Sequence, residues 1–523
     1  MSIKIRKILN IAIIFSLCFL SVIPAQDTTK SLAFKKNRPY KNSPYYYQPD
    51  LSYQLLHQFK LIQMANSGDP LAQHELGLRL LTGEGIPTDT STAVYWIKKA
   101  ASQKLSAAQY NYGIMLLNGW GTDWNPFLAY EYFLNAAQSG MSQAQYVLGL
   151  LYTDNLIVRR DWNTSYFWTK KAYDGGFEPA KEILDQISSK VSRSFIDSVS
   201  SDKFDYVKNK TNNNSDDDKI QPSLGLVYID FTENQDTVSN ISDKILIQDL
   251  ERIEIKNLFD TLGLKQTDSL LSSIKTNNQI EYLIELAESG SPEAMVLMGR
   301  LYETGTTIKM DLIIAAEYYV RATILDSHRA AYLLYKLMKQ KQFLEMLISA
   351  SRDNDAVAQF VWYGLHKLGY DNRLNDSDAS QLLLNSANQK HTPALIELGF
   401  NYYTGKYFNL DKRKGIEIWK IAAEYGSLES DLRIIASRLY DTPEKVNSSD
   451  IAALKNYSEK GSLLAQVALA NCYEKGIGIN TNMALAAKYY RTATQRGNRF
   501  AYEQLKRIYD SIRPDSKTFS IND

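Results

Sequence analysis

Cysteine is almost absent from this chain of 523 residues, which contains only two. Cys18 lies in an N-terminal apolar run, and the preceding Leu17 does not match the small residue that a lipoprotein signal requires. If that run is removed as a signal, Cys472 is the only thiol left, so no disulfide can form within the chain. Packing alone must then hold the fold, and we expect Cys472 to be buried and unreactive.

An excess of either charge is missing too. The chain has 59 Lys and Arg residues against 58 Asp and Glu residues, which gives a net charge of +1. Binding to nucleic acid needs a basic field that this balance does not supply, so nucleic acid is not expected as a partner. Long apolar runs are absent after residue 25, and we therefore expect no stable transmembrane anchor in the mature chain.

Motifs of catalysis and cofactor binding are missing as well. The chain has five histidines, and none has a second ligand at metal-binding spacing. It has no Gly-x-Ser-x-Gly nucleophile elbow and no phosphate-binding Gly-x-x-x-x-Gly-Lys loop. The Gly-x-Gly pairs fall in turns between expected helices and do not follow strands. The sequence therefore predicts no metal, no cofactor and no enzymatic activity.

The N-terminus has the pattern of a signal peptide. Lys4, Arg6 and Lys7 precede an apolar run over residues 8–23, and a small residue stands just before Gln26. The alternative is an uncleaved anchor, but the run is short for a membrane span of about 20 residues. We expect export with cleavage before Gln26, into the periplasm or medium of a bacterium, or into the endoplasmic reticulum lumen of a eukaryote.

What the chain does contain is an internal repeat of 36 residues, marked by small residues. Three copies keep strict spacing at Ala72, Ala108 and Ala144, at Gly77, Gly113 and Gly149, and at Ala100, Ala136 and Ala172. The interval of 23 residues from the middle glycine to the late alanine returns at Gly299–Ala322, Gly364–Ala387 and Gly399–Ala422, and Ala470–Ala493 has alanine in the glycine place. Several units also have a glycine six residues, and an aspartate twelve residues, after the middle position.

Each unit has the pattern of two helices joined by a turn. Apolar residues recur at helical spacing over 72–80 and again over 93–101, with a glycine-containing turn between them. The small residues inside the helices indicate close helix crossings. One such hairpin cannot bury its own apolar face, whereas stacked copies can. The sequence thus predicts an all-α fold, an α-solenoid with a right-handed superhelix, in two arrays.

The repeat resembles a known family. Its pattern Ala-x-x-x-Leu-Gly…Gly-x-Gly…Asp…Ala-x-x-Trp/Tyr-x-x-Lys-Ala-Ala-x-x-Gly, clearest over 108–113 and 465–497, is similar to the Sel-1-like repeat, a relative of the tetratricopeptide repeat. The resemblance covers residues 66–176 and 281–497, with Tyr335 and Ile435 in the glycine place of two divergent units. It implies a superhelical scaffold for contacts between proteins, as found in exported bacterial proteins and in quality control in the endoplasmic reticulum.

These patterns divide the chain into six parts. They are a signal peptide over 1–25, a flexible leader and first helix over 26–65, a first array over 66–187, a linker over 188–277, a second array with a capping helix over 278–510, and a tail over 511–523. The linker contains an Asn-, Asp- and Ser-rich stretch without apolar residues, which predicts disorder, followed by a connecting helix.

One column of side chains is a candidate binding surface. The position three residues before the middle glycine holds His74, Tyr110 and Tyr146, and one turn further on stand Asn118 and Asp154. Stacked units would align these side chains into a column that could accept a protein or peptide partner. The alternative is that they pack between units.

Two other functions remain open from the sequence. One is a hydrolase or cell-wall-acting enzyme on a repeat scaffold, which a deep cleft with two facing carboxylates would support. The other is a structural subunit that associates with itself through the arrays, and the sequence does not set the oligomeric state. We favour a non-catalytic scaffold for protein or peptide partners.

Overall fold

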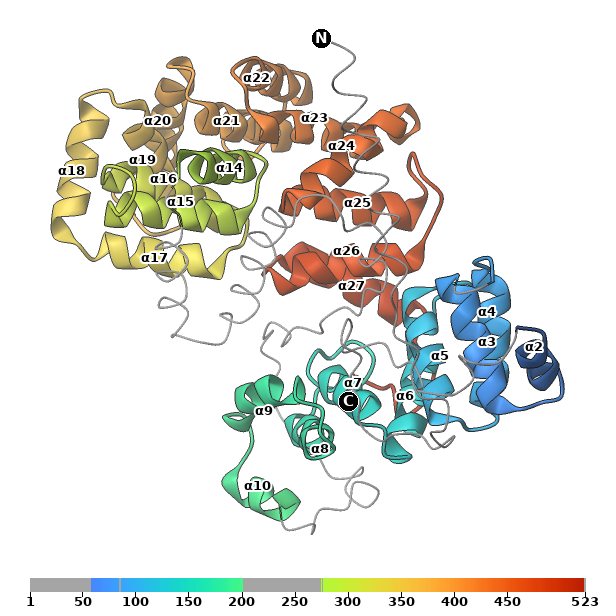
Figure 1. Cartoon of the computed structure of the whole chain (residues 1–523). Helices are drawn as coiled ribbons and strands as arrows, with labels where there is room; N and C mark the ends of the chain where they lie inside the picture. The colour runs from blue at the N-terminus through green and yellow to red at the C-terminus, as the bar shows by residue number, and fades with distance from the viewer. Residues whose placement is uncertain (1–57, 84–85, 201–273, 275, 522–523) are drawn as a thin grey trace, which may run out of the picture.

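The computed structural model describes residues 58–83, 86–200, 274 and 276–521, and every regular element in them is a helix (Figure 1). The predicted all-α fold is therefore confirmed. Three predicted segments lie outside these residues. They are the signal peptide, most of the leader, and the linker over 201–273, including its connecting helix. No helix in the described part of the chain is long and apolar enough to cross a membrane.

Most helices form hairpins of a first and a second helix. The first part of the chain comprises α2 (Gln58–Asn66), α3 (Pro70–Thr82), α4 (Thr90–Ser102), α5 (Ser106–Asn118), α6 (Pro126–Gln138), α7 (Ser142–Leu151), α8 (Trp162–Asp174), α9 (Ala180–Ser188) and α10 (Arg193–Ser200). The second comprises α14 (Asn277–Glu288), α15 (Pro292–Thr304), α16 (Leu312–Ile324), α17 (His328–Met338), α18 (Lys341–Arg352), α19 (Ala356–Lys367), α20 (Asp376–Asn388), α21 (Thr392–Thr404), α22 (Lys412–Glu424), α23 (Leu428–Asp441), the short 3₁₀ helix η3 (Pro443–Lys445), α24 (Ser448–Glu459), α25 (Leu463–Lys475), α26 (Met483–Gln495) and α27 (Arg499–Ser511).

The turn inside each hairpin is built from the recurring glycine and aspartate. Gly83 ends α3 in the left-handed conformation (φ 75°), and its N–H donates to the carbonyl of Arg79. Asp89 then caps α4, because its carboxylate accepts a hydrogen bond from the Thr92 N–H at 3.0 Å. The same pairing of glycine and aspartate recurs in the hairpins α15–α16 and α21–α22. Local chemistry therefore fixes where each helix stops and the next one starts.

The middle glycines permit the close crossing of the two helices in a hairpin. A Cβ atom placed on Gly113 would lie 2.7 Å from Cε1 of Phe133, which is too close for a real contact. The equivalent contacts are between Gly77 and Ile97, Gly149 and Thr169, Gly299 and Tyr319, and Gly399 and Trp419. In each pair the partner stands 20 residues later on the second helix, so the missing side chain of these five glycines leaves room for the partner.

Gly364 does not belong to this set. The middle glycine is the eighth residue of its helix elsewhere, and the eighth residue of α19 is Tyr363. A Cβ atom on Gly364 would contact Val320 of α16 instead of a residue of α20. Ser386 stands in the late alanine place, and its hydroxyl donates to the Ala356 carbonyl at 2.7 Å. The assignment of Gly364 as a repeat position was therefore wrong by one residue, because a chance spacing of 23 residues imitated the repeat.

The hairpin α17–α18 interrupts the second array. The starts of α17 and α19 are 28 residues apart, whereas first helices are 36 apart in the regular units. Helix α16 therefore contacts both α17, as in the regular units, and α19. Tyr335, which stands in the place of the middle glycine in α17, is 49% exposed.

The last hairpin, α25–α26, and the helix α27 that follows it join the two arrays. Buried residues of α25, α26 and α27 belong to the same hydrophobic cluster as those of α5 to α8. The ring of Tyr509 lies 5.3 Å from that of Trp124, and Arg513 Nη2 donates to the Leu156 carbonyl at 2.7 Å. Figure 1 shows α26 and α27 (red) beside α5 (blue-green). The predicted capping helix α27 thus lies against the first array.

The same hairpin also contacts the start of its own array. The backbone N–H of Leu463 donates to the Gly290 carbonyl at 3.3 Å, and the side chain of Arg496 forms a buried ion pair with Glu293. Lys460 and Glu285 form another ion pair at 2.7 Å. Helices α14 to α26 therefore curve until their last unit meets their first.

Candidate functional site

The predicted column of His74, Tyr110, Tyr146, Asn118 and Asp154 is buried. Their exposed fractions are 0%, 0%, 3%, 8% and 1%. These side chains pack within and between repeats, as the alternative expectation had it, and the prediction of an accessible column was wrong.

His74 and Tyr110 show how this packing works. His74 Nε2 lies 2.8 Å from Nδ2 of Asn111 in the next unit, and burial lowers the pKa of His74 to about 3. The ring of Tyr110 lies 5.8 Å from that of Phe133 in its own hairpin. Tyr146 makes a similar contact with Phe177 at 5.1 Å. The repeating side chains thus hold the hairpins together.

The other two predicted residues are internal as well. Asn118 Nδ2 donates to the Ile114 carbonyl of its own helix at 2.9 Å. Burial raises the pKa of Asp154 to about 6, and the positive charges of Arg491 and Arg160 offset part of this rise. Since Arg491 hydrogen-bonds Tyr509, Asp154 lies where the first array meets α26 and α27.

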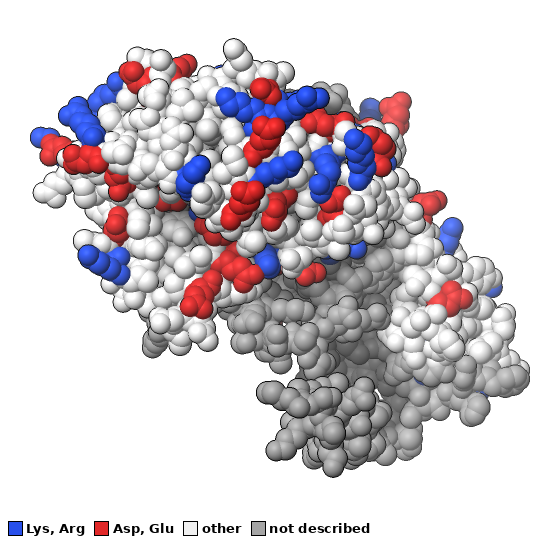
Figure 2. Space-filling view, turned by 90° about the horizontal axis from the view of Figure 1, so that it is seen from above, with Lys and Arg blue, Asp and Glu red and all other residues white. Residues whose placement is uncertain are grey.

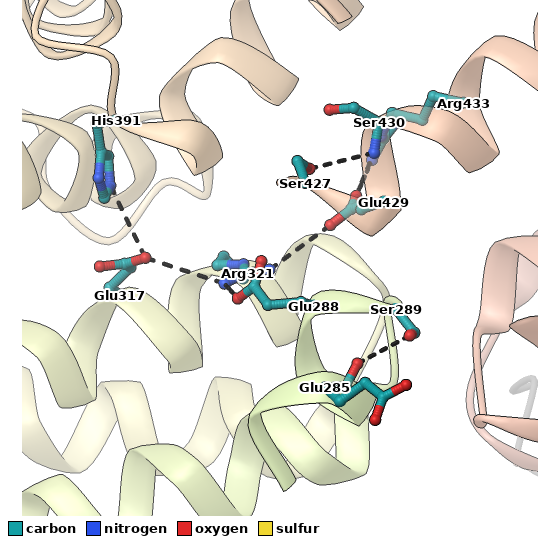
Figure 3. Close-up of polar contacts among 10 residues, drawn as sticks. All are labelled: Glu285, Glu288, Ser289, Glu317, Arg321, His391, Ser427, Glu429, Ser430 and Arg433. Atoms are coloured by element: carbon teal, nitrogen blue, oxygen red, sulfur yellow. Dashed lines mark hydrogen bonds and ion pairs between the residues drawn. The ribbon is translucent and has the colours of Figure 1, made fainter. Parts of the chain in front are cut away.

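A polar cluster in the second array lay outside the sequence predictions. Arg321, only 6% exposed, donates from Nη1 to Glu288 Oε1 at 2.6 Å. Its Nη2 lies 3.8 Å from Glu429 Oε2, and Nη1 lies 4.0 Å from Glu317 Oε1. Figure 3 shows these contacts, which continue to His391 on one side and to Arg433 on the other. We call these six residues the Arg321 cluster.

Three helices carry five of the six residues of the cluster, and the sixth, His391, is the N-cap residue at the start of α21. Glu317 and Arg321 stand four residues apart on α16 and so share one face of that helix. Glu288 is the last residue of α14. Glu429 lies in the first turn of α23, and Arg433 one turn later donates to its Oε1 at 2.7 Å. The curvature of the array thus brings together residues of three units.

The cluster holds charges whose protonation is shifted. Burial raises the pKa of Glu317 to about 7; the charge of Arg321 opposes the rise and that of Glu288 adds to it. Burial and Arg321 lower the pKa of His391 to about 4. Burial alone would lower the pKa of Arg321, but Glu288, Glu429 and Glu317 outweigh it and raise the pKa. Arg321 therefore stays charged, and Glu317 changes charge near neutral pH.

A pocket opens beside the cluster, between the C-terminal end of α16 and the first helices α19, α21 and α23. Its apolar wall consists of Ile324, Leu325, Phe360, Pro393 and Ile396, and its charged wall consists of Arg321, Glu397, Glu429 and Arg433. Among the described residues, Nη2 of Arg321 finds no hydrogen-bond acceptor. The pocket thus combines apolar contact with one buried donor that lacks an acceptor.

Comparison with known proteins identifies the repeat. The model of the Sel1 repeat family matches residues 70–105, 106–141, 142–177, 292–327, 392–427 and 463–498. The chain contains six Sel1 repeats. They coincide with the hairpins α3–α4, α5–α6, α7–α8, α15–α16, α21–α22 and α25–α26.

Two solved structures show related repeats. One is c5321, a protective antigen present in uropathogenic Escherichia coli strains and displaying an SLR fold; it is 19% identical, the match covers 88% of this chain and 83% of that one, and the TM-score is 0.30. The other is a Sel1 repeat protein from Oxalobacter formigenes, 35% identical over 24% of this chain and 96% of its own, with a TM-score of 0.24. The identification rests on the six Sel1 repeats.

The pocket lies where Sel1 repeats and divergent hairpins meet. Helices α16 and α21 belong to matched Sel1 repeats, whereas α19 and α23 belong to hairpins outside the matches. The pairs Glu317–Arg321 and Glu429–Arg433, each four residues apart, could have drawn attention in the sequence. Their approach across 108 residues could not, because it depends on how the array curves.

One face of the molecule shows no dominant charge (Figure 2). Figure 2 shows Lys and Arg side chains interspersed with Asp and Glu on the face seen from above. Nowhere in the residues that the structure describes do three or more His, Cys, Asp or Glu side chains gather as a metal site would require. The side chains that line the pocket offer hydrogen bonding, ion pairing and apolar contact.

Proposed function

We propose that this chain is an exported, non-catalytic scaffold that binds protein or peptide partners through its second array. Sel1 repeats generally mediate contacts between proteins. The observation that carries the proposal for this chain is the pocket beside the Arg321 cluster, which offers an apolar wall and a buried donor where four helices converge. Pockets of this kind suit side chains presented by a partner.

The chemistry of the pocket favours binding over catalysis. Two carboxylates, Glu397 and Glu429, line it, and two carboxylates can in other settings serve as acid and base. Here Glu397 is paired with Lys367 and accepts a hydrogen bond from Tyr363 at 3.1 Å, and Glu429 is paired with Arg433. Each negative charge is thus held by a cation, which suits a fixed binding surface better than proton transfer.

Export is the second part of the proposal. It is supported by the basic start at Lys4, Arg6 and Lys7, by the apolar run over 8–23 and by the small residue before Gln26. The near absence of cysteine requires that the exported chain hold its fold by packing. A bacterial periplasmic or secreted setting is the one we favour.

Photo-cross-linking in the source cells tests the scaffold. A photoreactive amino acid is placed singly at exposed positions of the second array, Tyr425 and Tyr440, and at Tyr95 of the first array as a comparison. We expect a reproducible adduct with the same protein from second-array positions and none from Tyr95. If no position yields an adduct with another protein, the scaffold proposal fails; adducts only between copies of this chain would favour the self-associating subunit.

A further inference from the structure

We infer that the pocket between α16, α19, α21 and α23 holds one apolar side chain of an extended peptide segment, whose neighbouring main-chain carbonyl accepts a hydrogen bond from Nη2 of Arg321. This inference rests on the proposed scaffold function and specifies the chemistry of its partner.

The apolar wall defines the first requirement. Phe360, Pro393 and Ile396 are buried, so their positions are fixed by the packing of α19 and α21. Ile324 and Leu325 at the end of α16 are half-buried and form the open side. A side chain of the size of leucine, isoleucine or phenylalanine would cover the apolar surface that Ile324 and Leu325 still expose, which favours binding.

Arg321 defines the second requirement. Its side chain is 6% exposed and is held by Glu288 through Nη1, so the guanidinium cannot turn freely. Nη2 has no hydrogen-bond acceptor within the described ranges. A buried donor left without an acceptor is unfavourable, and a ligand that supplies an oxygen there gains a charge-assisted hydrogen bond.

The surrounding charges indicate that the oxygen is neutral. Glu429 Oε2 already lies 3.8 Å from Arg321 Nη2, and Glu397 lines the same pocket. Arg433 and Lys367 neutralise these two acids and are not available to a further anion. Arg321 is itself paired with Glu288, so a ligand carboxylate would find no unpaired cation here to balance its charge, whereas a main-chain carbonyl brings an acceptor without a charge. The pocket therefore suits the interior of a peptide segment better than a free C-terminus.

The irregular hairpin α17–α18 creates this pocket. Because this unit is shorter than the regular ones, α19 also packs on α16, and the end of α16 shares the pocket with α21 and α23. The ring of Phe360 is held at 5.5 Å from that of His391, next to the Arg321 cluster. The divergent unit thus builds a site that a regular stack of Sel1 repeats would not form.

Peptide selection on the full chain tests the inference. Short peptides from a random display library are selected on the immobilised wild-type protein, and the affinity of selected peptides is measured by fluorescence polarisation. We expect a shared Leu, Ile, Met or Phe at an interior position. Ile324→Trp, which fills the open side of the pocket, should weaken binding by about tenfold or more.

Matched variants separate this effect from misfolding. Ile512→Trp makes the same change at a 42% exposed position at the end of α27 and should leave the affinity unchanged. Arg321→Lys removes the planar donor but keeps a charge, and it should weaken binding by about tenfold. If Arg321→Lys does not fold, Ile324→Trp with a wild-type circular dichroism melt still decides the matter.

Three results would overturn the inference. The first is that the selected peptides share no apolar residue. The second is that Ile324→Trp leaves their affinity unchanged. The third is that a peptide binds more tightly when its apolar residue is the C-terminal residue, with a free carboxylate. Each of these, combined with a protein adduct in the cross-linking experiment, would leave the scaffold function intact and remove only the pocket. Failure of the cross-linking experiment at every position would instead remove the scaffold function.

Discussion

Glutamine at the fourth position of the first helix links three of the hairpins to the helix before them. Gln73 Nε2 donates to the Ala65 carbonyl at 3.0 Å, and Gln145 Nε2 donates to the Ala137 carbonyl at 3.1 Å. Both side chains are buried, and Gln359 makes the equivalent bond to Ser351. One side chain therefore satisfies a carbonyl at the end of the previous helix.

Gln145→Ala should destabilise the fold by about 0.5–1.5 kcal/mol, because it removes a buried hydrogen bond to the Ala137 carbonyl, which keeps the Gly140 N–H as its other donor. Urea denaturation followed by circular dichroism measures the change. Gln381→Ala, at an exposed position of α20, serves as the control and should stay within about 0.5 kcal/mol of wild type. Equal effects of the two changes would show that the inter-repeat bond is not stabilising.

Gly113→Val should destabilise the protein by about 1–3 kcal/mol. Its Cβ would meet the Phe133 ring, which is fully buried and cannot move away. Helix propensity points the other way, since valine is a better helix former than glycine, so the sign separates crowding from propensity. Thermal melts decide it, with Gly113→Ala expected to cost less. A valine variant as stable as wild type would mean that the helices do not cross closely at Gly113.

Glu317 should make stability depend on pH. Its pKa in the folded chain is about 7, above the ordinary value of 4.5. Stability from a raised pKa is fully present at acid pH and is lost as pH rises through about 7. The free energy of unfolding of Glu317→Gln, relative to that of wild type, should therefore rise by roughly 2 kcal/mol from pH 5 to pH 8.

The difference between the two urea curves isolates Glu317 from other titrating groups. The pKa of His391 is lowered to about 4, so His391 makes both proteins less stable as pH falls. This effect runs opposite to that of Glu317. Asp154, with a pKa raised to about 6, also titrates in both. A difference between variant and wild type that does not change with pH would contradict the raised pKa of Glu317.

At the scale of elements, most helices could be predicted from the residues at their ends. Recurring glycines and aspartates gave the turns, because a left-handed cap and an N-cap are decided by a few neighbouring residues. The divergence at Tyr335 and Ile435 was visible as well. The contact of α19 with α16 was not, since the sequence shows that a unit departs but not where the next helix packs.

The binding surface was harder to predict than the helices. His74, Tyr110 and Tyr146 do recur at one face, but histidine and tyrosine suit both a wet groove and a helix interface. The rotation of each helix about its axis decides between the two, and here it buries them. Arg321, Glu288 and Glu429 come from three units, and their approach depends on the curvature of many hairpins together.

At the scale of the whole molecule, export remains a prediction from the sequence. We expect the mature protein to begin at Gln26, because a basic start, a short apolar run and a small residue precede it. Intact-mass measurement of material recovered outside the cytoplasm tests this. Exported protein that retains residues 1–25 would show that the segment is an anchor and is not cleaved.

The two arrays should stay together after the connecting segment is cut. The composition of residues 201–242, which lie outside the described residues, predicts that proteases cut there first. Because α25 to α27 share a hydrophobic cluster with α5 to α8, we expect both fragments to elute as one complex in size-exclusion chromatography with light scattering.

Arg513→Ala provides the comparison for this experiment, since it removes the hydrogen bonds to the carbonyls of Leu156 and Ile157. It should weaken the association of the cut fragments. Fragments of the wild type that separate at once would contradict the shared cluster.

The position of the last hairpin also bears on the order in which the protein can be completed. Helices α5 to α8 are made early, yet the residues that cover them, such as Tyr509 and Phe519, are among the last to be synthesised. At about 5–20 residues per second, the early helices wait for tens of seconds with apolar surface uncovered. A premature stop codon near the C-terminus would therefore leave apolar surface of α5 to α8, in the first array, uncovered.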